Sequence, residues 1–525
     1  MVGERRAASL VRRPRYRGRG DLHEVRRPRP LVVSSARCRG PLRHAARVRG
    51  TARVSVLFDP EVGTDEFRGS RVTIIGLGKG RTTAGLARFL VGRGATVTIT
   101  DPKTKEELAE GLARLEGLDA TLVLGPSSDD IALADPDFVF VIPGIRPRSP
   151  TILRALQRKV PVMTEMALFF RLCPAPIVGV TGTKGKTTTT TLIERVLSLG
   201  RRRVIVGGNI GTGAPLHLVD ALTPDDIVVL ELSSFQLETL GHSPHVAVVT
   251  NVLEDHLDHH GTRDAYILAK RNIVAWQGSR DIAVLNLDDP ATVALHTGSA
   301  SEVRGYSLSL RPKRGAHLDE EARLVLVSGD RRAVLCAASD LRVPGRHNVA
   351  NALAAAIVGD IFDIGAEAIG GALREFEGVP RRLESIGEAN GVLWVNDSAA
   401  TTPAATLSAL AAFPERPAVV ILGGVSKNAD FSALARALVL QARAAVLIGR
   451  AAGEIAQAIA SAGELPVRHA ASLEDAVTAA RELAQPGDVA LLSPACASTD
   501  MFSSADERGE RFSALVKAFV KPMKR

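Results

Sequence analysis

The chain has 525 residues, of which 45% are hydrophobic and 23% are charged. At roughly 100–200 residues per domain this length predicts about three domains, and the composition excludes a mostly disordered chain. No run of about 18 apolar residues occurs, which excludes a membrane-spanning helix. Four scattered cysteines without a CxxC pair are typical of the reducing cytoplasm, so we expect a cytoplasmic protein with no membrane partner.

The net charge of +9 comes from the N-terminal end of the chain. Residues 1–50 contain 15 Arg and three acidic residues, whereas residues 51–525 carry 51 basic and 54 acidic side chains. Tyr16 is the only aromatic residue in this basic segment, so we expect no base-stacking surface and no nucleic-acid partner. A disordered basic arm, an organelle transit peptide and translated upstream sequence remain alternatives. We favour the last, and place residues 1–65 outside the folded domains.

From residue 71 onward, short β-branched runs alternate with helical stretches. The first unit has strands at 72–75 and 96–100 on either side of a helix at 84–93, and a further strand at 138–142. The turn Gly76-Leu-Gly78 follows the first strand, and Asp101 ends the second. This arrangement is typical of a Rossmann-like nucleotide site.

Two further units continue the alternation. Expected strands lie at 177–180, 227–232, 246–252, 282–287, 393–396, 418–422, 445–448 and 488–492, with helices at 188–199 and 262–276 and Ala-rich helices in the last unit. The pattern predicts an α/β fold of parallel sheets covered by helices. We place the three domains at 66–165, 166–378 and 379–525, the first and last being Rossmann-like.

A phosphate-binding loop is the sharpest motif. The sequence Gly-Val-Thr-Gly-Thr-Lys-Gly-Lys-Thr-Thr at 179–188 follows an apolar strand and precedes a helix, as such a loop requires. Val180 stands where the strict pattern has Gly, so the loop is of a variant type. Lys186 would neutralise the β- and γ-phosphates, and the Thr187 hydroxyl would face Mg²⁺.

Candidate metal ligands follow the next strands. Glu231 ends one expected strand, and His256 follows the next in Asn-Val-Leu-Glu-Asp-His at 251–256. An acid and a histidine at the same sheet edge suit one or two Mg²⁺ ions beside a triphosphate. His259 and His260 raise the alternative of zinc, but their spacing fits no common zinc pattern, so we favour magnesium.

Taken together, these motifs resemble a known family. The loop, Gly-Asn-Ile-Gly at 208–211, Glu-Leu-Ser-Ser-Phe-Gln-Leu-Glu at 231–238 and the 251–256 segment are similar to the Mur ligases of peptidoglycan synthesis. Asn-Asp-Ser at 396–398 and Leu-Leu-Ser-Pro-Ala-Cys-Ala-Ser at 491–498 resemble the branch that adds D-glutamate. The resemblance runs from about residue 71 to the C-terminus. It implies a UDP-substrate domain, a central P-loop ATPase-like domain with a mostly parallel sheet, and a C-terminal amino-acid-binding domain.

The resemblance implies an ATP-dependent ligase that joins D-glutamate to UDP-N-acetylmuramoyl-L-alanine through an acyl phosphate, acting as a monomer with two Mg²⁺ ions. The implied catalytic residues are Lys186, Glu231, His256 and Lys270, and the implied metal ligands are Thr187, Glu231, His256 and Lys270, a lysine that this family carbamylates. The implied ATP contacts are Gly182, Thr183, Lys184, Gly185, Lys186, Thr187, Thr188, Asn286, Asp288, Arg382 and Asp397. The implied substrate contacts are Gly78, Asp101, Asn209, Ser233, Gln236, Thr401, Lys427 and Ser498.

Three positions depart from the family pattern. Ala399 replaces a common Lys, Ala505 stands where a Phe commonly lies under the glutamate, and Ile142 replaces a Ser before Pro-Gly. The first two leave D- against L-glutamate open. A folylpolyglutamate-type ligase is an alternative within the same class. An NAD-dependent dehydrogenase, or a nucleotide-binding regulatory protein with a basic arm, are alternatives from other classes.

Overall fold

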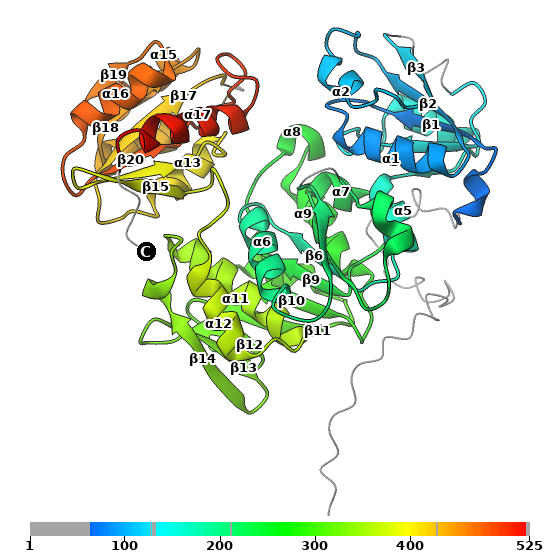
Figure 1. Ribbon diagram of the computed structural model, residues 1–525, viewed down its shortest axis with the longest axis horizontal. Coiled ribbons are helices and arrows are strands. Elements are labelled where there is room, and N and C mark those ends of the chain that lie inside the picture. Colours follow the sequence, from blue (N-terminus) through cyan, green and yellow to red (C-terminus); the bar gives the residue numbers. More distant parts are fainter. Residues whose placement is uncertain (1–62, 127, 129–132, 211–212, 427–428, 521–525) are drawn as a thin grey trace, which may run out of the picture. The chain divides into compact units, whose positions relative to one another are not determined.

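The computed structural model describes residues 63–126, 128, 133–210, 213–426 and 429–520. The expectations about residues 1–50 and about Lys427 lie outside these ranges. The described part contains three β-sheets, each flanked by helices, which confirms an α/β fold of three domains (Figure 1). Within it, no helix is both long enough and apolar enough to cross a membrane.

The first sheet is parallel throughout, with the strand order β3-β2-β1-β4-β5. Its strands are β1 Arg71–Ile75, β2 Thr96–Asp101, β3 Ala120–Leu124, β4 Phe138–Val141 and β5 Val162–Met163, and its helices are α1 Arg81–Gly92, α2 Ala109–Ala113 and α4 Pro150–Gln157. The chain proceeds from β1 to one side and returns to the other side at β4, the order of a Rossmann-like half. The Rossmann-like first domain is confirmed.

The central sheet has nine strands in the order β14-β13-β12-β11-β10-β9-β6-β8-β7. The strands are β6 Ile177–Thr181, β7 Val204–Gly208, β8 Ile227–Glu231, β9 Val246–Val249, β10 Ile282–Asn286, β11 Glu302–Ser307, β12 Gly315–Leu318, β13 Arg323–Ser328 and β14 Arg331–Ala337. The expected mostly parallel central sheet is confirmed, and its exceptions are the antiparallel pairs β12–β13 and β13–β14. Tight turns rather than helices join these strands, and a short connection permits only antiparallel pairing.

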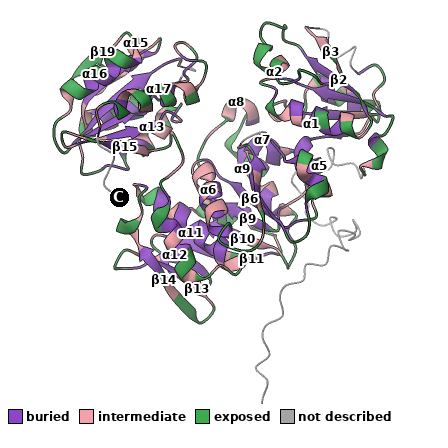
Figure 2. Cartoon of the chain, in the orientation of Figure 1, coloured by how far each residue is buried: buried purple, intermediate pink, exposed green. Residues whose placement is uncertain are grey.

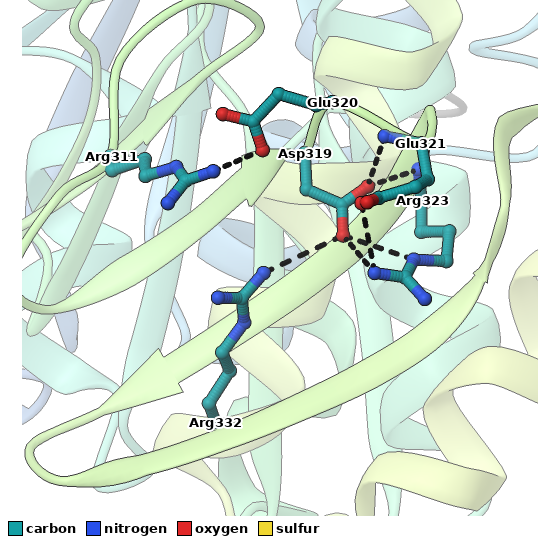
Figure 3. A network of polar contacts seen from close by, with 6 residues as sticks. All are labelled: Arg311, Asp319, Glu320, Glu321, Arg323 and Arg332. Carbon is teal, nitrogen blue, oxygen red and sulfur yellow. Dashed lines mark hydrogen bonds and ion pairs between the residues drawn. The ribbon is translucent and has the colours of Figure 1, made fainter.

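A polar network around Asp319 holds the turn between β12 and β13 (Figure 3). The Asp319 carboxylate accepts hydrogen bonds from the backbone N–H of Arg323 at 2.9 Å and from its guanidinium at 2.8 Å. Arg332 of β14 lies 3.5 Å from the same carboxylate, and Arg311 pairs with Glu320. The hydrogen bond from the Arg323 side chain lowers the pKa of Asp319 to about 2. The network therefore ties the turn to β13 and to the edge strand β14.

Helices cover both faces of the central sheet. They are α5 Glu165–Leu172, α6 Lys186–Leu197, α7 Ser234–Glu238, α8 Leu257–His260, α9 Arg263–Ala275, α10 Pro290–Leu295, α11 Arg346–Ile361 and α12 Ala366–Glu375. Alternate residues of β8 face opposite layers: Val229 packs in a core with α6 and α11, whereas Val228 packs in a core with α9. The strands β6, β8 and β9 are accordingly buried at every residue, while the helices expose their outer sides (Figure 2). Burial on both faces explains why these strands are continuous apolar runs.

The third sheet has six strands in the order β15-β16-β20-β17-β18-β19. They are β15 Glu384–Ala389, β16 Val392–Asn396, β17 Ala418–Gly423, β18 Ala442–Ile448, β19 Val467–His469 and β20 Val489–Leu492, with helices α13 Pro403–Leu410, α14 Ser432–Gln441, α15 Ala452–Ala462, α16 Leu473–Leu483 and α17 Ala505–Lys517. The strands are parallel except for the pair β15–β16, which is antiparallel. Asn390 and Gly391, which lie between β15 and β16, both have positive φ. This tight Asn-Gly turn makes the two strands a hairpin.

Candidate active site

The phosphate-loop sequence lies between β6 and α6, as predicted. Gly185 precedes α6 with φ +82°, and a Cβ there would lie 2.7 Å from the Asn351 side-chain oxygen. A Cβ on Gly182 would lie 1.8 Å from Thr250 Oγ1. Glycine is required at both positions because the loop backbone passes so close to its neighbours. The first-turn N–H groups of α6 lack intrahelical partners, so this helix end attracts anions.

Two residues that follow β9 hold the loop in place. Asn251 accepts hydrogen bonds from Thr183 N through its backbone oxygen and from Lys184 N through its side-chain oxygen, both at 2.9 Å. Its side-chain amide donates back to Lys184 O at 3.0 Å, and Thr250 Oγ1 donates to the same oxygen at 2.6 Å. The loop conformation is therefore set by the protein itself, which avoids an ordering cost when a phosphate binds.

Lys186 lies at the first position of α6 and points back over the loop. Its Nζ donates hydrogen bonds to Gly182 O at 3.0 Å and to Thr183 O at 3.1 Å. Burial lowers the pKa of Lys186, while the charge of Glu231 opposes this shift. The ammonium is thus held beside the loop by two neutral acceptors, and an anionic phosphate would be a stronger partner.

The carboxylate of Glu231 is hydrogen-bonded to two other predicted site residues, Thr187 and Asn209. Glu231 ends β8 and is 3% exposed. Its Oε2 accepts a hydrogen bond from Thr187 Oγ1 at 2.7 Å, and its Oε1 accepts one from the Asn209 side chain at 2.9 Å. The backbone N–H of Asn209 also donates to Glu231 O at 2.7 Å. A carboxylate and a hydroxyl beside a phosphate loop are the oxygen ligands that Mg²⁺ prefers.

Lys270 and His256 complete the central group. Lys270 of α9 is 1% exposed, its Nζ donates to Gly182 O at 3.0 Å, and it lies 4.7 Å from the centre of the Tyr266 ring. Burial lowers the pKa of Lys270 well below its ordinary value, and the charge of Lys186 adds to this. His256 precedes α8 with φ +54°, and burial also lowers the pKa of its imidazole. Burial therefore shifts both groups toward their neutral forms.

Other predicted residues of the central domain make local structural contacts. Ser233 and Gln236 form a capping box at the start of α7, in which Ser233 N and Oγ donate to Gln236 Oε1 at 2.9 and 3.0 Å. Asn286 donates to Thr250 O at 2.9 Å. The Asp288 carboxylate accepts hydrogen bonds from Ser307 Oγ and from the backbone N–H of Leu308, both at 2.6 Å. Asp288 thereby fixes the backbone after β11.

In the first domain, Asp101 organises the glycine-rich turn. One of its carboxylate oxygens accepts hydrogen bonds from the backbone N–H groups of Leu77 at 2.9 Å and Gly78 at 3.2 Å. Gly78 has φ +50°, and Asp101 is 6% exposed. The carboxylate expected to face a nucleotide thus binds the turn that precedes α1.

In the third domain, Asp397 is buried and bonded on both oxygens. It accepts hydrogen bonds from Leu383 N at 3.2 Å and from Ser493 Oγ at 2.8 Å. Burial raises the pKa of Asp397 to about 7, and the two hydrogen bonds oppose this shift. Ser493 belongs to the second predicted motif, so the structure joins the 396–398 and 491–498 segments through this carboxylate.

Arg508 joins the same two segments and was not predicted. Its fully buried guanidinium donates to Ser398 Oγ and O, both at 3.0 Å, and to Cys496 O at 3.3 Å. Ser498 lies nearby in sequence and is 4% exposed, whereas Thr401 is exposed. Arg382 is bonded through its backbone N–H to Val379 O. The contacts of these three residues with a ligand stay predictions.

The sequence analysis also missed two asparagines of α11. Asn351 accepts a hydrogen bond from Thr189 Oγ1 of α6 at 3.1 Å, and its amide donates to Asn348 Oδ1 at 3.1 Å. Both asparagines are buried. Buried polar residues are normally hydrogen-bonded to a specific partner. The signal available in the sequence was two asparagines three residues apart in an otherwise apolar helix.

Three family models match the chain in succession. The Mur ligase MurD-like N-terminal domain matches residues 70–164, the Mur ligase middle domain matches 180–359, and the Mur ligase glutamate ligase domain matches 381–496. These matches join a Rossmann-like sheet, a phosphate-loop domain and a second α/β domain in the order observed. The chain belongs to the Mur ligase family.

Individual relatives agree with the family models. The UDP-N-acetylmuramoylalanine--D-glutamate ligase of Pelotomaculum thermopropionicum is 39% identical over 454 residues, which are 86% of this chain and 99% of that protein. The enzyme of the same name from Symbiobacterium thermophilum is 40% identical over 450 residues, or 85% and 98% of the two chains. Among solved structures, the UDP-N-acetylmuramate-alanine ligase of Thermotoga maritima has a TM-score of 0.54 at 22% identity, covering 86% of this chain and 99% of that chain. This last likeness supports the fold.

Proposed function

We propose that this protein is an ATP-dependent amide ligase that joins D-glutamate to UDP-N-acetylmuramoyl-L-alanine in the synthesis of peptidoglycan precursors. The observation that carries the proposal is the buried Glu231 carboxylate, bonded to Thr187 of the phosphate loop and to Asn209 of the neighbouring strand end. Relatives that share 39–40% of the sequence carry this activity in their names. We also propose that the protein acts as a monomer in the cytoplasm.

The reaction needs an activated carboxylate. A free carboxylate is a poor electrophile, so the terminal phosphoryl group of ATP is first transferred to the L-alanyl carboxylate, giving an acyl phosphate and ADP. The amine of glutamate then attacks the acyl carbon, an amide forms, and inorganic phosphate leaves with one carboxylate oxygen. The loop and Lys186 would hold the phosphates in line with the acceptor and offset their charge.

The oxygen donors beside the loop fit a hard divalent cation, and Thr187 and Glu231 would hold Mg²⁺ there. When bound, this ion supplies positive charge to the transferring phosphoryl group. A second ion would use His256, Glu231 and a carbamate on Lys270. The buried, depressed-pKa amine of Lys270 supports that modification, because a neutral amine attacks carbon dioxide, releases one proton and becomes an anionic carbamate.

The remaining predicted contacts belong to three ligands. Asn209, Ser233 and Gln236 would contact the UDP-sugar, and Gly78 and Asp101 its uridine. Asn286, Asp288, Arg382 and Asp397 would lie about the ATP, and Thr401, Lys427 and Ser498 about the glutamate. Ala399 and Ala505 depart from the family pattern near the glutamate, so the assay below compares D- with L-glutamate.

Phosphate release by the full-length chain tests the proposal. The protein is mixed with UDP-N-acetylmuramoyl-L-alanine, ATP, Mg²⁺ and either D- or L-glutamate. We expect release with D-glutamate only, and none when either co-substrate is omitted. Release that depends on L-glutamate alone would overturn the stereochemical part. Release without an amino acid, or none under any condition, would overturn the ligase.

A further inference from the structure

Glu238, His259 and His260 form a cluster where α7 meets α8. His259 Nε2 lies 3.0 Å from Glu238 Oε2, and His260 Nδ1 lies 3.8 Å from the same oxygen. One ligand atom from each of the three side chains lies within 4.8 Å of the other two. In a tetrahedral zinc site with bonds near 2.0–2.1 Å, ligand atoms are about 3.3–3.5 Å apart. The cluster therefore needs only small side-chain movements to ligate one ion.

The environment of His260 points to a ligand independently. Its side chain is 0% exposed, and its Nε2 lies 3.0 Å from Ser234 Oγ. Its Nδ1 is buried and has no hydrogen-bond partner among the residues that the structure describes. Leaving a buried imidazole nitrogen unbonded is unfavourable. If Nε2–H donates to Ser234, Nδ1 presents its lone pair to the cluster, which is the arrangement that orients a ligating histidine.

Aromatic packing holds both rings in place. The Phe235 ring stacks on His260 with centres 5.6 Å apart, and meets His259 edge-on at 4.5 Å. The two imidazoles lie edge to face at 4.8 Å. His259 and Glu238 are 9% and 23% exposed at their side chains, so the cluster opens to solvent on the side of the carboxylate. A metal ion can therefore enter a site whose ligands are already oriented.

We propose that Glu238, His259 and His260 bind one Zn²⁺ ion, with water as the fourth ligand, and that this ion joins α7 to α8. Two imidazoles and one carboxylate suit zinc rather than magnesium. The third ligand comes from a different helix than the histidine pair, which is why linear spacing did not reveal the site. The ion would also fix His256, which precedes α8, relative to Glu231, which precedes α7. The binding itself does not depend on the ligase proposal.

Metal titration tests the site without an activity assay. Chelator-treated, desalted full-length protein is titrated with Co²⁺, and then with Zn²⁺, in excess Mg²⁺ that occupies the other proposed sites. We expect one equivalent of Co²⁺ with the strong visible absorption of a tetrahedral ion, displaced by one equivalent of Zn²⁺. Glu238→Gln and His259→Gln should weaken zinc binding at least about 100-fold. Losing only a residue that hydrogen-bonds to a metal ligand already costs about 10–100-fold in affinity.

Matched controls make the outcome decisive. His296→Gln changes a histidine of the same domain that bonds to Ser301 instead, and it should bind zinc like the parent protein. Both cluster variants change partly exposed side chains, and unchanged circular dichroism shows that they fold. The proposal is overturned if no stoichiometric binding occurs. It is also overturned if the cluster variants bind normally while Glu231→Gln and His256→Ala lose the ion.

Discussion

Replacing Glu231 by Gln separates the charge of this side chain from its structural role. Glu231 is buried, and each carboxylate oxygen accepts one hydrogen bond, from Thr187 and from Asn209. In the Gln variant the amide oxygen still accepts from Asn209, and the amide nitrogen donates to the Thr187 hydroxyl, which is able to accept. Both hydrogen bonds are kept, but the negative charge is lost, and so is one oxygen atom that could ligate Mg²⁺.

The two effects have different magnitudes. Because the hydrogen bonds are replaced, stability should change by no more than about 1 kcal/mol. Turnover should fall about 10²–10³-fold, the usual effect of removing one preorganised electrostatic group and equal to about 2.7–4 kcal/mol in the transition state. Glu231→Ala leaves the buried Asn209 amide without its acceptor, so it should cost about 1–3 kcal/mol of stability in addition.

Phosphate release at saturating substrates and Mg²⁺ measures the loss of turnover, and urea unfolding measures the change in stability. The reasoning is refuted if the Gln variant retains turnover within about threefold of the parent, since the charge would then be dispensable. It is equally refuted if Gln and Ala destabilise the domain to the same extent, since the two hydrogen bonds would then not have been remade.

Five further substitutions follow from the structure. Lys186→Met should abolish turnover with unchanged circular dichroism, and normal activity would exclude the loop assignment. Lys270→Ala should lose activity that acetate partly restores, whereas failure of every short carboxylate would argue against a carbamate. Gly117→Ala, at φ +75° with no atom of the described residues within 4 Å of the new Cβ, should cost only the backbone strain of about 1–2 kcal/mol. Gly185→Ala, at φ +82° with an oxygen 2.7 Å away, should lower the melting temperature further, and equal losses would contradict the clash. Burial raises the pKa of Asp397 to about 7, so between about pH 4 and 7 the folded state binds more protons than the unfolded one and loses stability as pH rises. Asp397→Asn should therefore be more stable relative to the parent at pH 8 than at pH 5, and a difference independent of pH would contradict this.

Most of the long apolar parallel strands were accessible from the sequence, whereas the parallel strands β3, β5, β7, β11 and β19 were not predicted. The predicted strand at 227–232 became β8, Ile227–Glu231, because a continuous apolar run suits a strand covered on both faces. The hairpin strands β13 and β14 were missed, because only Gly329 and Asp330 separate them and no helix lies between them to mark the alternation. Pairing direction at this edge depends on turn geometry, which the alternation of strands and helices does not encode.

Some residues of the candidate site could likewise be predicted from the sequence, and others could not. Lys186, Thr187 and Glu231 could be predicted, because a loop motif and a strand end place them within one local framework. Asn351 could not, since its contact with Thr189 joins positions far apart in the chain and depends on how α11 packs on α6. The Asp101 carboxylate was predicted to face a nucleotide, but a motif does not reveal that the turn amides beside it already occupy one oxygen.

Transfer of isotopic oxygen tests the central claim most directly. UDP-N-acetylmuramoyl-L-alanine labelled with ¹⁸O in both carboxylate oxygens is incubated with the protein, ATP, Mg²⁺ and D-glutamate, and the released phosphate is analysed by mass spectrometry. Formation of an acyl phosphate predicts one ¹⁸O in each phosphate released and one in the new amide carbonyl. Unlabelled phosphate accompanied by the dipeptide product would contradict the account.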